Sequence, residues 1–177
     1  MADASLTATA SQTIGPYWHL IEYPEMADLL RFGATGEAIT VQGTLTDGAG
    51  QAVTDAAVEI WQASPPVSDT FPAHGRCRTD AAGRFRFRTL KPGPVPGLGN
   101  AQQAPHIAIT LMARGLLRGL TTRLYFQDEP LNDTDPVLSL IEDPAHRATL
   151  IAKPDGADTW TLDIRLRGDS ETVFLDI

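Results

Sequence analysis

The stretch Arg84-Phe85-Arg86-Phe87-Arg88-Thr89-Leu90 alternates charged and aromatic side chains. Successive side chains of a β-strand point to opposite faces, so the two phenylalanines share one face and the three arginines share the other. An antiparallel strand with one face on a hydrophobic core and one face in solvent requires this pattern. We therefore expect a half-buried strand here, whose arginines lie in solvent or at an interface with acidic groups of a partner chain.

Other short segments with strand character lie on both sides of this stretch, at residues 39–45, 57–62, 106–112, 120–126, 160–166 and 171–177. The segments between them that are rich in proline and glycine, 64–82 and 91–105, are expected to be long loops. Residues 138–151 are mixed, and Asp143-Pro144 is a typical helix start within them. The pattern predicts an all-β fold, an antiparallel β-sandwich with long loops and one or two short helices.

The chain has 177 residues, which is the size of one domain with room for an additional arm. No period of 2 or 3.6 organises the first residues, although the arm contains a turn at Gly15-Pro16 followed by two aromatic residues. We expect residues 1–37 to form an N-terminal arm that packs on the sandwich and on a partner chain. Residues 38–177 are expected to form the sandwich domain.

The formal net charge of −8 argues against nucleic acid and anionic membranes as partners, because both require a positive surface. Cys77 is the only cysteine, so no disulfide forms within the chain, and we expect a half-buried, inert thiol there. The N-terminus lacks the features of a signal peptide, and no apolar stretch approaches the length of a membrane span. Together these features favour a cytoplasmic protein.

Three segments resemble the intradiol ring-cleavage dioxygenases and occur in the same order along the chain: residues 41–63, residues 84–96 and residues 105–111. Further matching segments are Thr9–Tyr17, Thr122–Phe126 and Glu171–Phe174. The resemblance implies a β-sandwich that holds one ferric ion through two tyrosinates and two histidines. A phenolate is a hard anionic ligand suited to Fe(III), and imidazole nitrogens complete such a site.

Most of the ligands that the resemblance implies are replaced in this chain. Val95 stands at the position of one ligand tyrosine, Ala108 replaces one histidine, and residues 64–82 contain no tyrosine. His106 is left over, and a lone histidine does not hold iron. The resemblance therefore implies a chain with no metal site and no catalytic residue of its own. The Fe(III) is then held by a homologous β chain in an αβ hetero-oligomer of several copies.

The resemblance also implies the substrates protocatechuate and O2, with 3-carboxy-cis,cis-muconate as the product. Thr13, Gly15, Pro16 and Tyr17 of the arm match residues at the interchain substrate pocket. Alternatively, Tyr17 anchors the arm to the sandwich. Arg123 matches the arginine that faces the substrate in the family. An arginine suits this role because a guanidinium binds a carboxylate through two parallel hydrogen bonds.

Simpler alternatives remain at this stage. Arg123 is otherwise a surface arginine paired with Asp128 or Glu129. The whole chain is otherwise a stand-alone, non-catalytic β-sandwich module that binds aromatic carboxylates, or an enzyme with a different ligand set. A neighbouring reading frame that carries the complete set of two tyrosines and two histidines would favour the subunit interpretation.

Overall fold

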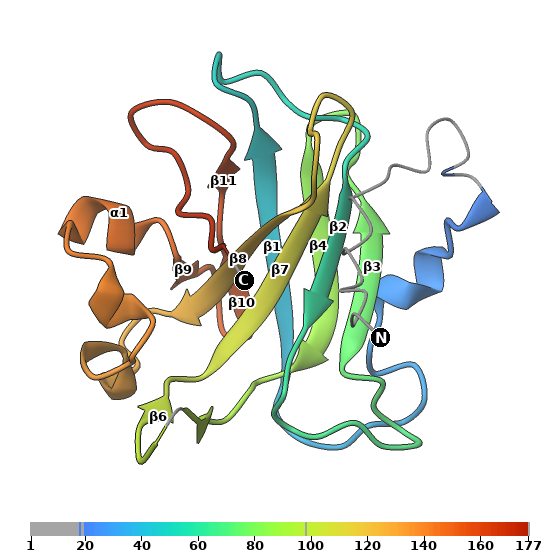
Figure 1. The fold of residues 1–177 in the computed structure, drawn as a ribbon. Helices are drawn as coiled ribbons and strands as arrows, with labels where there is room; N and C mark the ends of the chain where they lie inside the picture. The colour runs from blue at the N-terminus through green and yellow to red at the C-terminus, as the bar shows by residue number, and fades with distance from the viewer. Residues whose placement is uncertain (1–17, 19, 98, 177) are drawn as a thin grey trace, which may run out of the picture.

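The structure is a computed structural model that describes residue 18 and residues 20–97 and 99–176. Figure 1 shows two packed layers of strands, with β2, β7 and β8 in front of β1 and β4. The strands are β1 (Ala38–Thr46), β2 (Ala57–Trp61), β3 (His74–Arg78), β4 (Arg84–Leu90), β5 (Val95–Pro96), β6 (Gln102–Gln103), β7 (His106–Met112), β8 (Leu120–Phe126), β9 (Ile151–Pro154), β10 (Thr159–Thr161) and β11 (Ile164–Arg165). The helices are η2 (Pro24–Ala27), η3 (Pro130–Asp133), η4 (Leu138–Leu140) and α1 (Pro144–Ala148).

The main sheet has the order β11-β1-β10-β9-β8-β7-β2-β3, and β4 pairs with β1 beside this path. Strand β9 connects the two layers, because it pairs with β10 on one side and with β8 on the other. The pairs β1/β10, β1/β11 and β8/β9 are parallel, and the other pairs are antiparallel. The prediction of an all-β fold with little helix is confirmed.

The hydrophobic core lies between the two layers and is supplied by alternate residues of the long strands. Phe85 and Phe87 are 2% and 1% exposed, as the alternation of β4 predicts. Opposite them lie buried aliphatic residues of the other layer, Val58, Ile60, Ile107, Ile109 and Leu124. Each such side chain contributes about 1.5–3 kcal/mol on burial. The arginines of β4 are exposed, and two of them form ion pairs within the chain, Arg84 with Asp80 and Arg88 with Asp28.

Strand β3 contradicts the prediction that residues 64–82 form one long loop. Its sequence, His74-Gly75-Arg76-Cys77-Arg78, lacks the apolar alternation that identifies a half-buried strand. The strand forms because its backbone pairs with β2 over five residue pairs, and it ends the sheet order as an edge strand. An edge strand has fewer apolar neighbours, so its pattern is weaker.

The last two predicted strands also differ from the structure. The segment 160–166 divides into β10 and β11, because its parallel ladder with β1 is interrupted at residues 162–163, where the Asp163 carboxylate accepts the backbone N–H of Thr44 at 2.9 Å. Residues 171–176 form an isolated bridge, Leu175 with Thr121, in place of a strand. The hydroxyl groups of Thr172 and Thr149 accept the backbone N–H groups of Arg165 and Val173, so side chains replace the regular ladder here.

The segment that precedes β1 packs closely against the sandwich. Leu29 is fully buried in the core, and its backbone N–H donates to Arg88 O of β4 at 2.9 Å. Helix η2 lies against β3, where Gly75 leaves space: a Cβ atom there would lie 2.5 Å from Leu29 Cδ1. Residues 24–30 therefore cover the edge between β3 and β4.

The loop that begins at Lys91 is fixed by an aromatic contact. The Lys91 ammonium lies 3.4 Å from the ring centre of Phe126 and 3.8 Å from that of Trp160. Burial lowers the pKa of Lys91 to about 8, while the two ring faces stabilise the ammonium form. This contact anchors the segment that leads to Val95. None of the helices in the described ranges is long and apolar enough to cross a membrane.

Candidate functional site

Three of the sequence-predicted site positions, His106, Ala108 and Arg123, lie on the outward face of β7 and β8, and Val95 lies on β5. His106 is opposite Tyr125, and Ala108 is opposite Arg123 in the antiparallel register. The intervening residues Ile107 and Leu124 are fully buried in the core. Since side chains alternate along a strand, His106, Ala108, Arg123 and Tyr125 all project away from the main core. Tyr125 is itself fully buried there, in a second and smaller hydrophobic cluster with Ala104, Leu138 and Leu150. In Figure 1 these two strands cross the centre of the front layer.

The residues on this face do not fit a ferric ion. Val95 pairs with Gln103 in the small β5–β6 ladder, and neither Val95 nor Ala108 carries a donor atom for a metal. Within the part of the chain that the structure describes, no three His, Cys, Asp or Glu residues form a metal-binding group. Hard anionic oxygen ligands are what Fe(III) needs, so no step of a reaction is assigned to iron on this chain.

His106 is held inside the chain by its own neighbours. Its Nδ1 lies 2.8 Å from Ala104 O, so Nδ1 carries the proton and donates to the carbonyl. The imidazole ring packs against Tyr125, with 5.6 Å between ring centres. Burial lowers the pKa of His106 below its ordinary value, so the ring is neutral at pH 7.

Arg123 is half-buried and is bound by two neutral acceptors. Its Nη1 donates to Gln103 Oε1 at 2.7 Å and to the Tyr125 hydroxyl at 3.1 Å. The ion pairs of the described residues do not include Arg123, so the alternative pairing with Asp128 or Glu129 is not what the structure contains. The guanidinium is therefore fixed in place without being neutralised by direct contact with a carboxylate.

Behind Arg123 lies a buried carboxylate that completes the polar cluster. The Tyr125 hydroxyl donates to Asp135 Oδ1 at 3.1 Å, and Asp135 is fully buried. Burial raises the pKa of Tyr125, so its hydroxyl remains protonated and can donate this bond. Asp135 also accepts backbone N–H groups from Ala104, Val137 and Leu138 at 2.8–2.9 Å. Asp135 thus joins the segments that surround Arg123.

Sequence reasoning missed Gln103, Tyr125 and Asp135 as neighbours of Arg123. Tyr125 was recoverable, because it lies two residues beyond Arg123 on the same strand and must share its face. Gln103 comes from the short strand β6 and Asp135 from the loop after η3, and no sequence spacing places them beside Arg123. The arm residues Thr13, Gly15, Pro16 and Tyr17 lie outside the residues that the structure describes.

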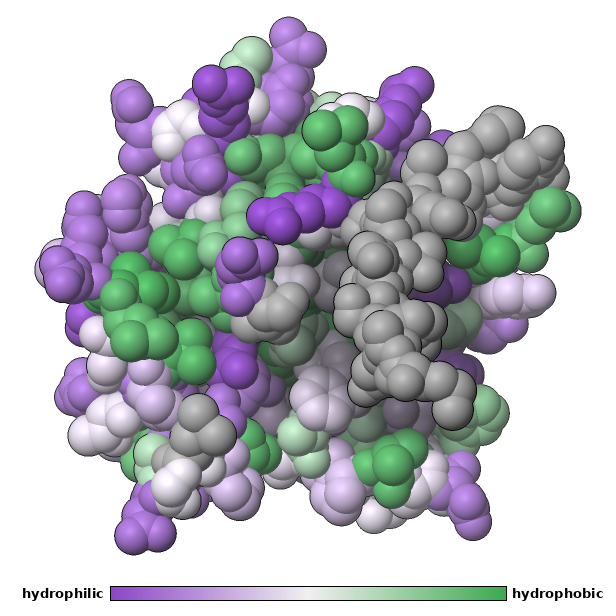
Figure 2. All heavy atoms as spheres, in the orientation of Figure 1, coloured by the Kyte–Doolittle hydropathy of each residue, from purple (hydrophilic) through white to green (hydrophobic). Residues whose placement is uncertain are grey.

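An exposed aromatic residue lies next to Ala108, where the sequence predicts a replaced metal ligand. Trp61 of β2 is opposite Ala108 of β7, so Ala108 lies between Trp61 and Arg123 across the sheet. The Trp61 side chain is 52% exposed. Figure 2 shows this side of the molecule, where hydrophobic residues gather in separate groups between hydrophilic ones. The outward face thus offers a flat ring and a cation on either side of a small residue.

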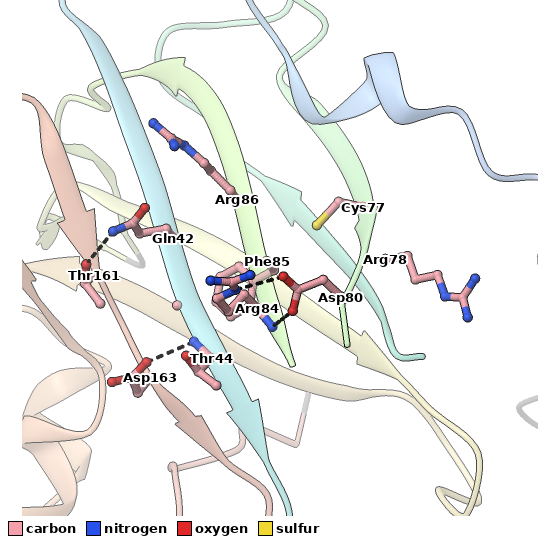
Figure 3. A pocket seen from close by; sticks show the side chains of 11 residues that line it. Gln42, Thr44, Cys77, Arg78, Asp80, Arg84, Phe85, Arg86, Thr161 and Asp163 are labelled. Carbon is pink, nitrogen blue, oxygen red and sulfur yellow. Dashed lines mark hydrogen bonds and ion pairs between the residues drawn. The ribbon is translucent and has the colours of Figure 1, made fainter. Parts of the chain in front are cut away.

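A second concave feature lies near the edge between β3 and β4. An open cleft of about 510 Å³ is lined by residues of β1, β3, β4 and β10 and by Asp163, which follows β10. Among the others are Gln42, Cys77, Arg78 and Arg86. Figure 3 shows that Arg78 and Arg86 point away from one another. The third arginine of the lining, Arg84, is paired with Asp80, so these three guanidinium groups do not form one shared cation site in the cleft.

The thiol of Cys77 beside this cleft is expected to react slowly. Burial raises the pKa of Cys77 to about 12, so almost no thiolate is present at pH 8. Labelling by a disulfide reagent at pH 8 should be at least ~100-fold slower in the folded protein than after denaturation. Labelling at equal rates in both states would show that the thiol is accessible and ionised.

Known proteins resemble this chain in sequence and in fold. The sequence profile of the family described as Dioxygenase matches residues 26–168. The chain belongs to the intradiol ring-cleavage dioxygenase family.

Three individual proteins show how far the similarity extends along the chain. The chain is 40% identical to the protocatechuate 3,4-dioxygenase alpha chain of Pseudomonas putida, over 97% of each chain. It is 34% identical to the beta chain of the Burkholderia cepacia enzyme, over 77% of this chain and 67% of that one. Among solved structures, the dioxygenase domain of a carbohydrate-binding fusion protein from Streptomyces sp. SirexAA-E matches 94% of this chain and all of that domain, with a TM-score of 0.63 and 29% identity.

Proposed function

We propose that this chain is the alpha subunit of a protocatechuate 3,4-dioxygenase, and that a homologous β chain holds the Fe(III). The observation that carries the proposal is similarity to an alpha chain over nearly the whole length, combined with Val95 and Ala108 at positions where a metal ligand is needed. The complex inserts both atoms of O2 between the two hydroxyl-bearing carbons of protocatechuate. The product is 3-carboxy-cis,cis-muconate.

In this proposal the two chains divide the work. The iron of the β chain provides the ring-cleavage chemistry, and the alpha subunit completes the substrate pocket. Arg123 neutralises the carboxylate of protocatechuate, and Thr13, Gly15, Pro16 and Tyr17 shape the wall around the ring. Residues 1–37 act as an arm on the sandwich of residues 38–177 and on the β chain. The complex works in the cytoplasm.

The test is to measure iron content and protocatechuate cleavage for the chain expressed alone and together with its β-chain homologue. We expect iron and activity only in the co-purified pair. The isolated chain should be poorly soluble or unstable, because the surface that normally contacts the partner is then exposed to water. Iron and activity in the chain alone would overturn the proposal.

The same experiment separates the rival function. A stand-alone module that binds aromatic carboxylates would be soluble and monomeric, and would bind protocatechuate in equilibrium dialysis without any partner. That result, together with failure to co-purify with the β-chain homologue, would replace the subunit assignment with the binding module.

A further inference from the structure

Among the residues that the structure describes, the guanidinium of Arg123 has hydrogen-bond partners at Nη1 and none at its Nε–Nη2 edge. An arginine side chain carries five N–H donors: one on Nε and two on each terminal nitrogen. Both hydrogens of Nη1 are used, one by Gln103 and one by Tyr125. Within the described residues, the hydrogen bonds of Arg123 do not involve Nε or Nη2. The open Nε–Nη2 edge is the geometry with which arginine binds a carboxylate side-on.

The two acceptors on Nη1 are themselves held by different parts of the fold. Gln103 lies on β6 and its amide donates to Pro96 O at 3.0 Å, in the loop anchored by Lys91. Tyr125 lies on β8 and its hydroxyl donates to the buried Asp135. Because the two supports lie on separate elements, the guanidinium plane cannot rotate without breaking one of these bonds.

The chemistry of the two acceptors keeps the charge of Arg123 available. A glutamine amide and a phenol hydroxyl accept hydrogen bonds but carry no negative charge. Asp135 reaches Arg123 only through the Tyr125 hydroxyl, and its remaining bonds go to backbone N–H groups. The cluster therefore orients a cation and leaves its attraction for an external anion largely intact.

We propose that Gln103 and Tyr125 are positioning residues that turn the Nε–Nη2 edge of Arg123 toward the carboxylate of the aromatic substrate. Asp135 fixes Tyr125 from behind. This inference rests on the proposed function, because it assigns the selectivity for a carboxylate-bearing catechol to the polar cluster on the alpha subunit. Selectivity then depends on how well the guanidinium is held, as well as on its presence.

The test uses the co-expressed αβ complex and compares the KM for protocatechuate with the KM for catechol, which lacks the carboxylate. Tyr125→Phe keeps the ring packed against His106 and removes only the hydroxyl. Gln103→Met keeps the length of the side chain and removes the acceptor. Each change should raise the ratio of the KM for protocatechuate to the KM for catechol (the KM ratio) about tenfold. This is the loss expected for one hydrogen bond to a charged group. The double variant should exceed either single variant.

Thr110→Val serves as the matched control. Thr110 lies on the same outward face of β7, opposite Thr121, and is not one of the hydrogen-bond partners of Arg123. Its replacement should leave the KM ratio unchanged, whereas a general disturbance of the face would move it. The carboxamide of protocatechuate provides a second comparison, since its KM should respond to Tyr125→Phe much less than the KM for protocatechuate does.

Failure of this inference can be distinguished from failure of the proposed function. If Arg123→Ala raises the KM ratio and neither Tyr125→Phe nor Gln103→Met does, the positioning role is wrong while the subunit assignment stands. If the αβ complex does not cleave protocatechuate, both proposals are wrong. If Tyr125→Phe does not assemble, the Gln103→Met variant alone decides the positioning role, because Gln103 is partly exposed at the end of a short ladder.

Discussion

Replacing Arg123 by alanine in the assembled complex is expected to raise the KM for protocatechuate about 100-fold, because removal of one partner of a desolvated charge pair costs several kcal/mol. The KM for catechol should change by no more than about twofold, since catechol offers no anion to the guanidinium. Steady-state kinetics with both substrates measures the effect. The change in kcat should be small, because the carboxylate lies away from the carbon atoms that react.

Two further variants make this result specific. Arg123→Lys keeps the positive charge but loses the two-pronged geometry, so its KM for protocatechuate should lie between those of the native complex and Arg123→Ala. Arg114→Ala removes an arginine that is 81% exposed and pairs with Asp55, so neither KM should change. Equal increases of KM for both substrates in Arg123→Ala would mean that the residue supports the fold and does not bind the carboxylate.

Replacing Gly43 by alanine should lower the stability of the sandwich by about 3 kcal/mol or more, since overpacking of a close-packed core has no cheap relaxation. A Cβ atom at Gly43 would lie 1.9 Å from the backbone oxygen of Leu162 and 2.8 Å from Phe85 Cζ. Leu162 lies in the short interruption between β10 and β11, and both of these strands pair with β1. The melting temperature should fall by roughly 10 °C in a domain of this size.

Gly119→Ala is the matched control for this prediction. The nearest atoms to a Cβ at Gly119 lie at 3.6 Å, which is ordinary van der Waals contact. Its melting temperature should stay within a few degrees of the native value. A Gly43→Ala variant that melts like Gly119→Ala would show that the backbone at Leu162 shifts freely, and the close approach of the two segments would not be needed for the fold.

The long strands were predictable because their burial follows a simple alternation. Phe85 and Phe87 identify β4, and the apolar runs 106–112 and 120–126 coincide with β7 and β8. The failures have a common cause, which is that backbone pairing decided them and side-chain hydrophobicity did not. Strand β3 has a polar sequence on an edge, and the ladder with β1 is interrupted at residues 162–163 although the segment alternates without a break.

The candidate site was predictable only in part. That Val95 and Ala108 carry no donor atom for a metal is a property of residue types and can be read from the sequence, whereas their place at metal-ligand positions stays a prediction from the resemblance. The surroundings of Arg123 depend on long-range contacts. Gln103 lies 20 positions away in the sequence, and Asp135 reaches the cluster through its hydrogen bond with Tyr125. No local period encodes such contacts. The arm residues Thr13, Gly15, Pro16 and Tyr17 remain a prediction.

The segment 24–30 has a consequence for the behaviour of the chain during assembly. Strands β3 and β4 end their respective layers, and an open strand edge can recruit a strand from another molecule. Leu29 binds the backbone of β4 while η2 rests on β3, with Gly75 allowing the close approach. The segment therefore blocks the strand edge and prevents strands of other molecules from adding to the sheet. Loosening it would produce fibrous or amorphous aggregates from molecules whose sandwich is otherwise intact.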